Sequence, residues 1–231
     1  MKLGIMQPYF LPYIGYWQLI KSVDVFVIYD NIQYTKKGWF NRNRYLLNGK
    51  DALFSINLKN DNDFLNVSDR FLSPEYKRAK LIAMFQNAYS KAPMKNEILP
   101  FFMDIINFQE ENLFKYIYNS VIKICEHLEI KTEIVISSSI NIDHSLKSEN
   151  KVLAICKKLG AETYINSIGG IELYSKEMFK EQGIELKFIK SKPIEYKQFN
   201  NEFVPWLSIL DVLMFNDKEK VKDFLKEYEL V

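Results

Sequence analysis

The sequence is poor in the residues that characterise metal-binding and thiol-dependent proteins. It has two cysteines and two histidines among 231 residues. A structural zinc site is not expected, because such a site needs closely spaced Cys or His ligands. Cys125 and Cys156 lie in apolar, helix-like stretches, which favours buried, reduced thiols over a catalytic nucleophile.

An excess of one charge is also missing. Lys and Arg number 31 against 29 Asp and Glu, which gives a formal net charge of +2. This balance argues against nucleic acid as the main partner. No apolar run reaches the length of about 18 residues that a membrane span needs, and the first residues do not resemble a secretory leader. We therefore expect a cytoplasmic protein without membrane insertion.

Flexible linkers are lacking as well. Eight glycines and seven prolines in 231 residues form no Gly-rich or Pro-rich stretch, and no internal repeat is present. The composition is instead 48% hydrophobic and 15% aromatic, enough to close a large core. We predict one α/β domain over residues 1–231, with a helical insertion at about 75–130.

Hydrophobic periodicity predicts strands that alternate with helices. Residues 3–6 and 25–29 form a first parallel β-α-β unit around a helix at 12–21, and an alternating pattern predicts a half-buried strand at 52–58. The C-terminal part reads β-α-β-α-β, with Ser148 as a helix cap and Gly160 as a helix end. The prediction is a mainly parallel, Rossmann-like sheet flanked by helices. The further expected strands are 134–136, 163–165 and 184–188, and the further helices are 75–89, 97–107, 111–129, 148–159, 175–182, 206–214 and 217–228.

Ligands bind such sheets beyond the carboxyl ends of the strands, and two unusual segments follow the first two strands. Residues 7–16 combine two prolines with four aromatics, a stiff loop on which a sugar or base can pack. Residues 30–44 form a predicted polar loop whose cations can bind phosphate or carboxylate. The alternatives are aromatics that close the core and a solvated basic loop. The candidate residues here are Gln7, Tyr9, Tyr13, Tyr16, Asp30, Gln33, Lys36, Trp39, Asn41, Arg42, Asn43 and Arg44.

Weaker candidates come later in the chain. Asn166, Gly169 and Gly170 follow a strand and can hold an anion with backbone amides, although a plain turn accounts for them equally well. His144 lies in a loop beyond a strand and is the histidine best placed as an acid or base. Gln198 and Asp211 belong to a polar set on an apolar frame; Asp211 either faces the site or anchors a neighbouring loop.

Five ordered blocks resemble the WbqC-like protein family. They are Gln7–Tyr16, Asp30–Arg44, Ala88–Pro93, Leu159–Gly170 and Leu207–Asp211. The resemblance covers nearly the whole chain and implies a place among bacterial genes for O-antigen and other surface polysaccharides. Many family members carry two adjacent acids where this chain has Tyr29 and Asp30, so no metal site is expected here.

A second resemblance concerns Tyr13-Ile14-Gly15-Tyr16. Its layout, after a strand and at the start of a helix, resembles the HxGH motif of nucleotidylyl transferases. Both histidines are tyrosines here. A tyrosine hydroxyl donates hydrogen bonds but carries no positive charge for triphosphate oxygens. The resemblance implies a retained scaffold with altered or lost ATP chemistry.

Three functions remain open at this stage. The first is an enzyme that transfers an acyl or aminoacyl group to a nucleotide-linked amino sugar. In it, aromatic rings stack on the ligand, cations hold the diphosphate, and Asp30 or His144 handles the proton. The second is a nucleotidylyl or adenylate-forming transferase, and the third is a non-catalytic binding partner in the same pathway. The residues define neither a cofactor nor an oligomeric state.

Overall fold

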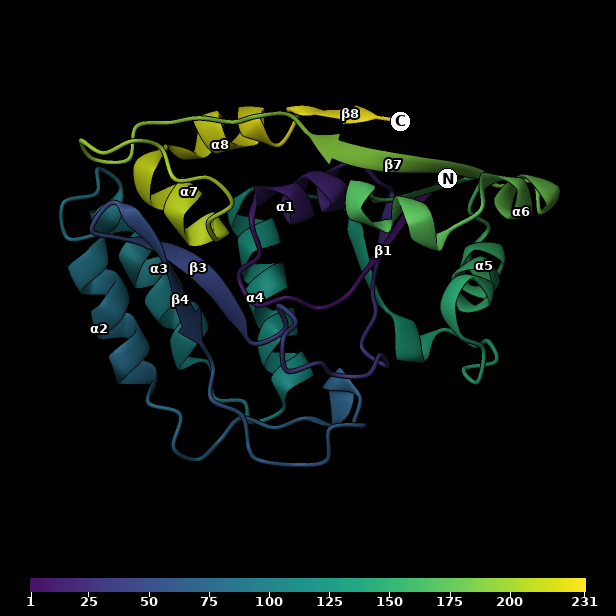
Figure 1. Cartoon of the computed structure of the whole chain (residues 1–231), viewed down its shortest axis with the longest axis horizontal. Coiled ribbons are helices and arrows are strands. Elements are labelled where there is room, and N and C mark those ends of the chain that lie inside the picture. The colour runs from purple at the N-terminus through teal and green to yellow at the C-terminus, as the bar shows by residue number, and fades with distance from the viewer.

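A twisted six-stranded sheet organises the molecule (Figure 1). The computed structural model describes all 231 residues, and the strand order is β5-β2-β1-β6-β7-β8. The first five strands in this order are mutually parallel, whereas β8 pairs antiparallel with β7. The strands are β1 (Lys2–Met6), β2 (Val25–Ile28), β5 (Glu133–Ile136), β6 (Thr163–Ser167), β7 (Glu185–Ser191) and β8 (Tyr228–Leu230).

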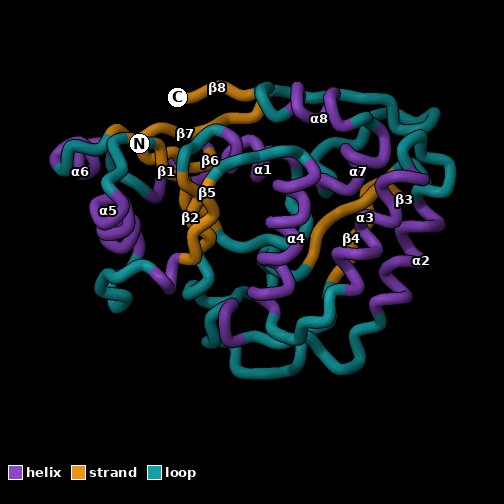
Figure 2. The backbone as a smooth tube through the Cα atoms, turned by 180° about the vertical axis from the view of Figure 1, so that it is seen from behind, coloured by secondary structure: helices purple, strands orange, loops and turns teal.

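Helices cover both faces of this sheet. In β2, Phe26 and Ile28 pack with the core that includes α1 (Ile14–Lys21), while Val25 and Val27 pack with α5 (Ser148–Leu159) and α6 (Lys176–Glu181) on the other face. Figure 2 shows α5 and α6 on one side of the strands and α4 (Leu113–His127) on the other. Burial on both faces explains why β2 is a continuous apolar run.

The remaining elements lie beside the α1 face. β3 (Arg42–Leu47) and β4 (Lys50–Ser55) form an antiparallel hairpin outside the main sheet. Asn48 and Gly49 close it with φ of 51° and 75°, the left-handed pair that a tight hairpin turn requires. The helices of this side are α2 (Arg78–Ala88), α3 (Lys95–Asn107), α4, α7 (Ile209–Phe215) and α8 (Lys218–Phe224).

The chain leaves β1 and β6 in opposite directions. From β1 it passes through α1 to β2, and from β6 it passes through α6 on the other face to β7, so β2 and β7 flank the β1/β6 pair. Such a reversal of strand order separates the outgoing loops and leaves a crevice at the carboxyl ends of the two strands. The fold therefore defines a place for a ligand before any side chain is considered.

The predicted α/β fold with a mainly parallel sheet is confirmed. None of the helices combines the length and apolar character that crossing a bilayer requires. The interpretation of residues 42–44 as loop was wrong, because Arg42 begins β3. Ser148 is not the cap of α5, since Lys147 holds that position without a side-chain hydrogen bond. The helix expected from 206 begins at Ile209, because Ser208 caps it by accepting a hydrogen bond from the Leu210 N–H.

Candidate functional site

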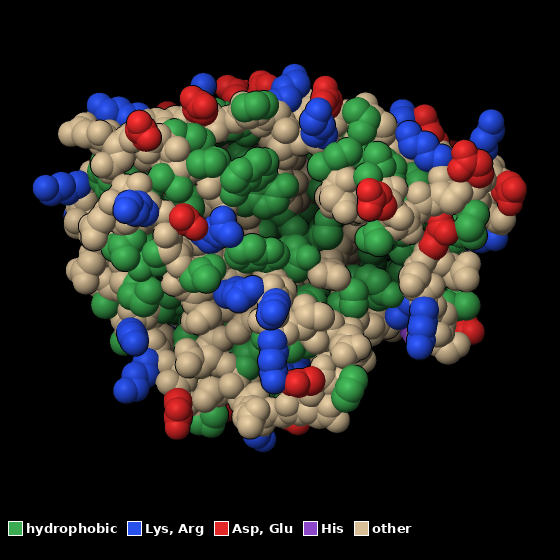
Figure 3. Space-filling view, viewed as in Figure 1, with side chains coloured by type: hydrophobic (Ala, Val, Ile, Leu, Met, Phe, Trp, Pro, Cys, Tyr) green, Lys and Arg blue, Asp and Glu red, His purple; other side chains and the backbone are tan.

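A cavity of about 340 Å³ opens at the carboxyl ends of β1 and β6. We call it the β1/β6 cavity. Figure 3 shows a hollow near the middle of this face, surrounded by apolar side chains, with basic side chains along one edge. Its volume lies within the range of about 300–1,000 Å³ typical of small-molecule sites. It is lined by Met6, Tyr9, Pro12, Tyr13, Gly15, Tyr16, Leu19, Trp39, Asn43, Arg44, Ser167 and Trp206.

Three tyrosines from the segment after β1 form one wall of the cavity. Tyr13 lies against the first turn of α1, where a Cβ on Gly15 would overlap its ring and hydroxyl. The Tyr9 hydroxyl donates to Gln7 Oε1 at 2.8 Å, and the Tyr16 hydroxyl donates to the Gln7 carbonyl at 3.1 Å. Gln7 therefore orients two rings from behind the cavity wall. Burial raises the pKa of Tyr9 to about 12 and also raises that of Tyr16, which keeps both phenols neutral.

Arg44 is the charged side chain in the cavity lining. Its guanidinium carbon lies 5.4 Å from the Trp39 ring centroid, and that of Arg42 lies 5.5 Å from the same ring. Arg42 also donates hydrogen bonds to the carbonyls of Gly38 and Lys37, so it shapes the Trp39 loop. Arg44 makes only an exposed ion pair, 3.6 Å from Asp51 Oδ2, and such pairs are weak. Its guanidinium is therefore available to an anion in the cavity.

The buried amide of Asn43 joins the two predicted segments. Asn43 Nδ2 donates to the Leu11 carbonyl at 2.9 Å and to the Phe10 carbonyl at 3.3 Å. Asn41 Nδ2 donates to the Ile56 carbonyl at 2.8 Å and its Oδ1 accepts from the Tyr34 hydroxyl at 2.9 Å. These contacts place β3 beside the aromatic loop. Asn43 thus builds the cavity as well as lining it, whereas Asn41 supports β3 from outside.

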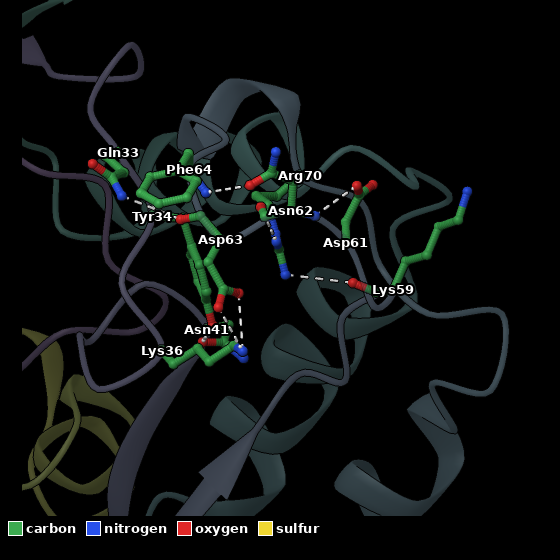
Figure 4. A network of polar contacts seen from close by, with 10 residues as sticks. All are labelled: Gln33, Tyr34, Lys36, Asn41, Lys59, Asp61, Asn62, Asp63, Phe64 and Arg70. Carbon is green, nitrogen blue, oxygen red and sulfur yellow. Dashed lines mark hydrogen bonds and ion pairs between the residues drawn. The ribbon is translucent and has the colours of Figure 1, made fainter.

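Gln33 and Lys36 lie apart from the cavity, in a polar network at the edge of the molecule (Figure 4). Lys36 Nζ pairs with the Asp63 carboxylate at 2.9 Å, and Gln33 Nε2 donates to the Asp63 carbonyl at 3.2 Å. In the same network, Arg70 stacks on the Tyr34 ring, with its guanidinium carbon 4.6 Å from the centroid. This network attaches the 30–36 segment to residues 62–70.

Asp30 and His144 lie at the carboxyl ends of β2 and β5. The buried Asp30 Oδ1 accepts from Ser137 Oγ at 2.8 Å and from the Ser138 N–H at 2.9 Å. His144 Nδ1 accepts from Asn31 Nδ2, and its Nε2 donates to the Ile140 carbonyl, both at 3.0 Å. Neither side chain is part of the β1/β6 cavity lining.

The predicted glycine loop opens η3 (Ile168–Leu173), a short 3₁₀ helix after β6. Asn166 is buried, and its Oδ1 accepts from the Ser167 N–H at 2.7 Å. Gly170 approaches that amide closely, because a Cβ there would lie 2.7 Å from Asn166 Nδ2, whereas Gly169 faces open space. Ser167 lines the cavity and these three residues do not.

Asp211 in α7 and Gln198 in the 192–208 segment belong to one buried network. The Asp211 carboxylate accepts from the Tyr89 hydroxyl at 2.9 Å, and from the Tyr196 hydroxyl and Gln198 Nε2 at 2.6 Å each. Burial raises the pKa of Asp211 to about 6. Neither residue is part of the β1/β6 cavity lining, and the Asp211 carboxylate contacts the 192–208 segment through Tyr196 and Gln198.

Among the lining residues that were not predicted as site residues, Ser167 and Trp206 are the polar and the aromatic one; the others are Met6, Pro12, Gly15 and Leu19. Ser167 ends β6 as Met6 ends β1, a position that the strand pattern alone can indicate. Trp206 is 63% exposed, has a φ of 62°, and its ring centroid lies 5.6 Å from that of Tyr13. A tryptophan directly after Pro205 was the available signal in the sequence, but its position across the cavity depends on long-range packing.

Comparison with known protein families matches residues 7–223 to the WbqC-like protein family. The chain belongs to this family. It is 28% identical over 229 residues to the uncharacterized protein Rv1507c of Mycobacterium tuberculosis (strain ATCC 25618 / H37Rv), and the alignment covers 97% of each chain. No solved structure shows significant similarity to the chain. The WbqC-like match spans both segments that meet at the cavity.

The cavity of this WbqC-like chain combines three kinds of group. Aromatic rings offer flat apolar faces, neutral tyrosine hydroxyls offer hydrogen bonds, and Arg44 offers a positive charge with several donors. A ligand that matches all three carries a ring and an anionic group. This chemistry is suited to binding and orientation.

Proposed function

We propose that this chain binds a nucleotide-linked sugar in the β1/β6 cavity and acts in the biosynthesis of O-antigen or another surface polysaccharide. The observation that carries the proposal is the cavity itself, where aromatic faces and one arginine meet at the reversal of strand order. Open α/β sheets bind nucleotides at this position. The family resemblance supports the pathway.

Each part of such a ligand has a partner. Trp39 and Tyr9 offer ring faces for the base or sugar, and aromatic stacking adds affinity beyond the area buried. Arg44 is positioned for the diphosphate, since a guanidinium binds two phosphate oxygens through paired hydrogen bonds. The hydroxyl of Ser167 and the amide of Asn43 lie in the same lining and can orient the sugar.

The proposed reaction is acyl or aminoacyl transfer to an amino sugar. The amine nitrogen of the sugar forms a bond to the carbonyl carbon of an activated acyl donor. The bond between that carbon and the leaving group breaks, the leaving group keeps the electron pair, and the amine loses one proton. Asp30 and His144 remain the proposed proton-handling residues; they follow β2 and β5, at the same edge of the sheet as the cavity.

Arg44→Ala tests the binding step. Loss of a charge-assisted contact costs about 1.5–3 kcal/mol, so affinity for UDP- and dTDP-linked amino sugars should fall by roughly 10- to 100-fold in isothermal titration. Lys36→Ala is the matched control, because it removes a cation of the same segment that is paired with Asp63 outside the cavity. Equal effects of the two variants would contradict the proposal.

Turnover is tested separately by mass spectrometry. Incubation with a bound amino sugar nucleotide and a panel of activated acyl and aminoacyl donors should give a product whose mass increases by the acyl group. Binding without turnover across the panel would overturn the transferase assignment and favour a non-catalytic binding partner.

One observation favours a second candidate, nucleotidylyl or adenylate-forming transfer. Tyr13, Gly15 and Tyr16 all line the cavity at the start of α1, directly after β1, which is the layout of the HxGH motif. Exchange of labelled pyrophosphate into ATP tests it. Absence of exchange, with normal nucleotide binding by Tyr13→Phe and Tyr16→Phe, would eliminate this candidate.

A further inference from the structure

A second and larger cavity adjoins the first. It has a volume of about 750 Å³ and lies at the carboxyl end of β7, between the start of α1, the 192–207 segment and α7. We call it the β7 cavity. Because β7 and β6 are parallel neighbours, the two cavities open at the same edge of the sheet. Ile14, Ile194 and Phe203 contribute to a mainly apolar lining.

The two cavities share a wall made of Tyr13 and Trp206, which line both. The two rings meet edge to face, with centroids 5.6 Å apart. The backbone next to Trp206 is fixed, since the Ser208 N–H donates to the Arg44 carbonyl and the Ile209 N–H donates to the Pro12 carbonyl, both at 2.9 Å. The wall is therefore attached to both segments that form the first cavity.

Trp206 has an unfavourable backbone conformation and an exposed side chain. Its φ of 62° lies in the left-handed region, which is unfavourable for a bulky side chain. Its side chain is 63% exposed, although burial of a tryptophan normally stabilises a protein. Residues held in such a strained backbone conformation are concentrated at functional sites. A ring that two cavities share can contact ligands in both.

Two lysines that line the β7 cavity form ion pairs, and two glutamates that line it do not. Lys190 pairs with Glu229 at 3.0 Å and Lys192 with Glu227 at 3.8 Å. Glu195 and Glu202 also line the cavity; both are exposed, and neither makes an ion pair or a side-chain hydrogen bond. Each of these cations has an acidic partner outside the lining, in an exposed and therefore weak pair, whereas no cation lies within ion-pair distance of the two acids. This pattern complements a positively charged group on an apolar molecule.

We propose that the β7 cavity binds the second substrate of the transferase, and that this substrate carries a primary ammonium group on an apolar body. An activated aminoacyl group with an aliphatic or aromatic side chain has this chemistry. The inference rests on the proposed function, because it assigns the donor whose acceptor occupies the β1/β6 cavity. The two proposed sites adjoin at the Tyr13–Trp206 wall.

L-phenylalaninamide is a suitable probe, since its amide replaces the donor ester and leaves one positive charge. Isothermal titration should show that it binds, whereas N-acetyl-L-phenylalaninamide, which is uncharged, and 3-phenylpropionate, which is negative, bind at least about tenfold more weakly. Glu195→Gln and Glu202→Gln should each lower the affinity for L-phenylalaninamide by about three- to tenfold, as expected for a partly exposed charged contact. Glu181→Gln, an exposed and unpaired glutamate of α6, is the matched control and should change nothing.

The outcomes separate this inference from the proposed function. Amide binding that depends on Glu195 and Glu202, with unchanged affinity for the sugar nucleotide, supports both. Failure of the amide to bind while the sugar nucleotide binds overturns the inference and leaves the proposed function in place. If N-acetyl-L-phenylalaninamide binds as tightly as L-phenylalaninamide, the inference is also overturned, because the cavity then does not recognise the ammonium group. If the wild-type chain does not bind the sugar nucleotide, the proposed function is wrong.

Discussion

Asp211 is a completely buried carboxylate without a cationic partner. Its oxygens accept three hydrogen bonds, from the Tyr89 and Tyr196 hydroxyls and from Gln198. Desolvation disfavours the charged form more than these contacts favour it, and the pKa of Asp211 rises to about 6. Because Tyr196 also lines the β7 cavity, this network connects the buried core to the proposed donor site.

The raised pKa predicts a specific pH dependence of stability. A carboxyl whose pKa is higher in the folded than in the unfolded state stabilises the fold most at low pH, and this contribution is lost as pH rises through about 6. Asp211→Asn removes the titration while preserving the shape. The free energy of unfolding of the wild type, measured relative to this variant, should therefore fall by up to about 3 kcal/mol between pH 4 and 7. A difference that does not vary with pH would contradict this account.

Among elements, the first turn of α1 contributes most directly to the cavity. Gly15 has no side chain, and the Tyr13 ring occupies the space that a Cβ would take. The helix thus presents Tyr13 to both cavities because glycine follows it by two positions.

Gly15→Ala should separate binding from folding. Alanine favours a helix by about 1 kcal/mol over glycine, so the secondary structure should persist in circular dichroism. The Tyr13 ring must move, however, and affinity for the sugar nucleotide should fall at least about tenfold. Gly169→Ala is the matched control, since nothing lies within 4 Å of its added Cβ. Unchanged affinity in Gly15→Ala would show that the position of Tyr13 does not matter.

Elements with a strong hydrophobic pattern could be predicted from the sequence, and those held by long-range contacts could not. β2 is apolar on both faces and α4 has an apolar stripe, so both are confirmed near their predicted positions. β3 was missed because its polarity is inverted: Asn43 is buried against the Phe10 and Leu11 carbonyls, while two arginines stack on Trp39. β8 is three residues long and is defined only by its pairing with β7.

The candidate site also contains residues that the sequence could predict and residues that it could not. Tyr9, Tyr13, Tyr16 and Arg44 stand out near the ends of predicted strands, and the structure places them together. Trp206 reaches them from the far end of the sequence through packing of the 192–208 segment, which no local pattern describes.

In the molecule as a whole, one edge of the sheet carries two adjoining cavities. The strand order brings the ends of β1, β6 and β7 together, and the β3–β4 hairpin and the 192–208 segment form the outer walls. Arg44 lines one cavity, and two glutamates without ion pairs line the other, which is the arrangement that the proposed acceptor and donor require. The arrangement suits an enzyme that holds an anionic acceptor beside a cationic donor.

The central claim is that the β1/β6 cavity binds a nucleotide-linked sugar. A crystal structure of the chain with a UDP-linked amino sugar tests it most directly. The account predicts diphosphate oxygens within hydrogen-bond distance of the Arg44 guanidinium, about 2.7–3.2 Å, and a ligand ring packed on Trp39 or Tyr9. A ligand bound elsewhere on the molecule, with this cavity unoccupied, would contradict it.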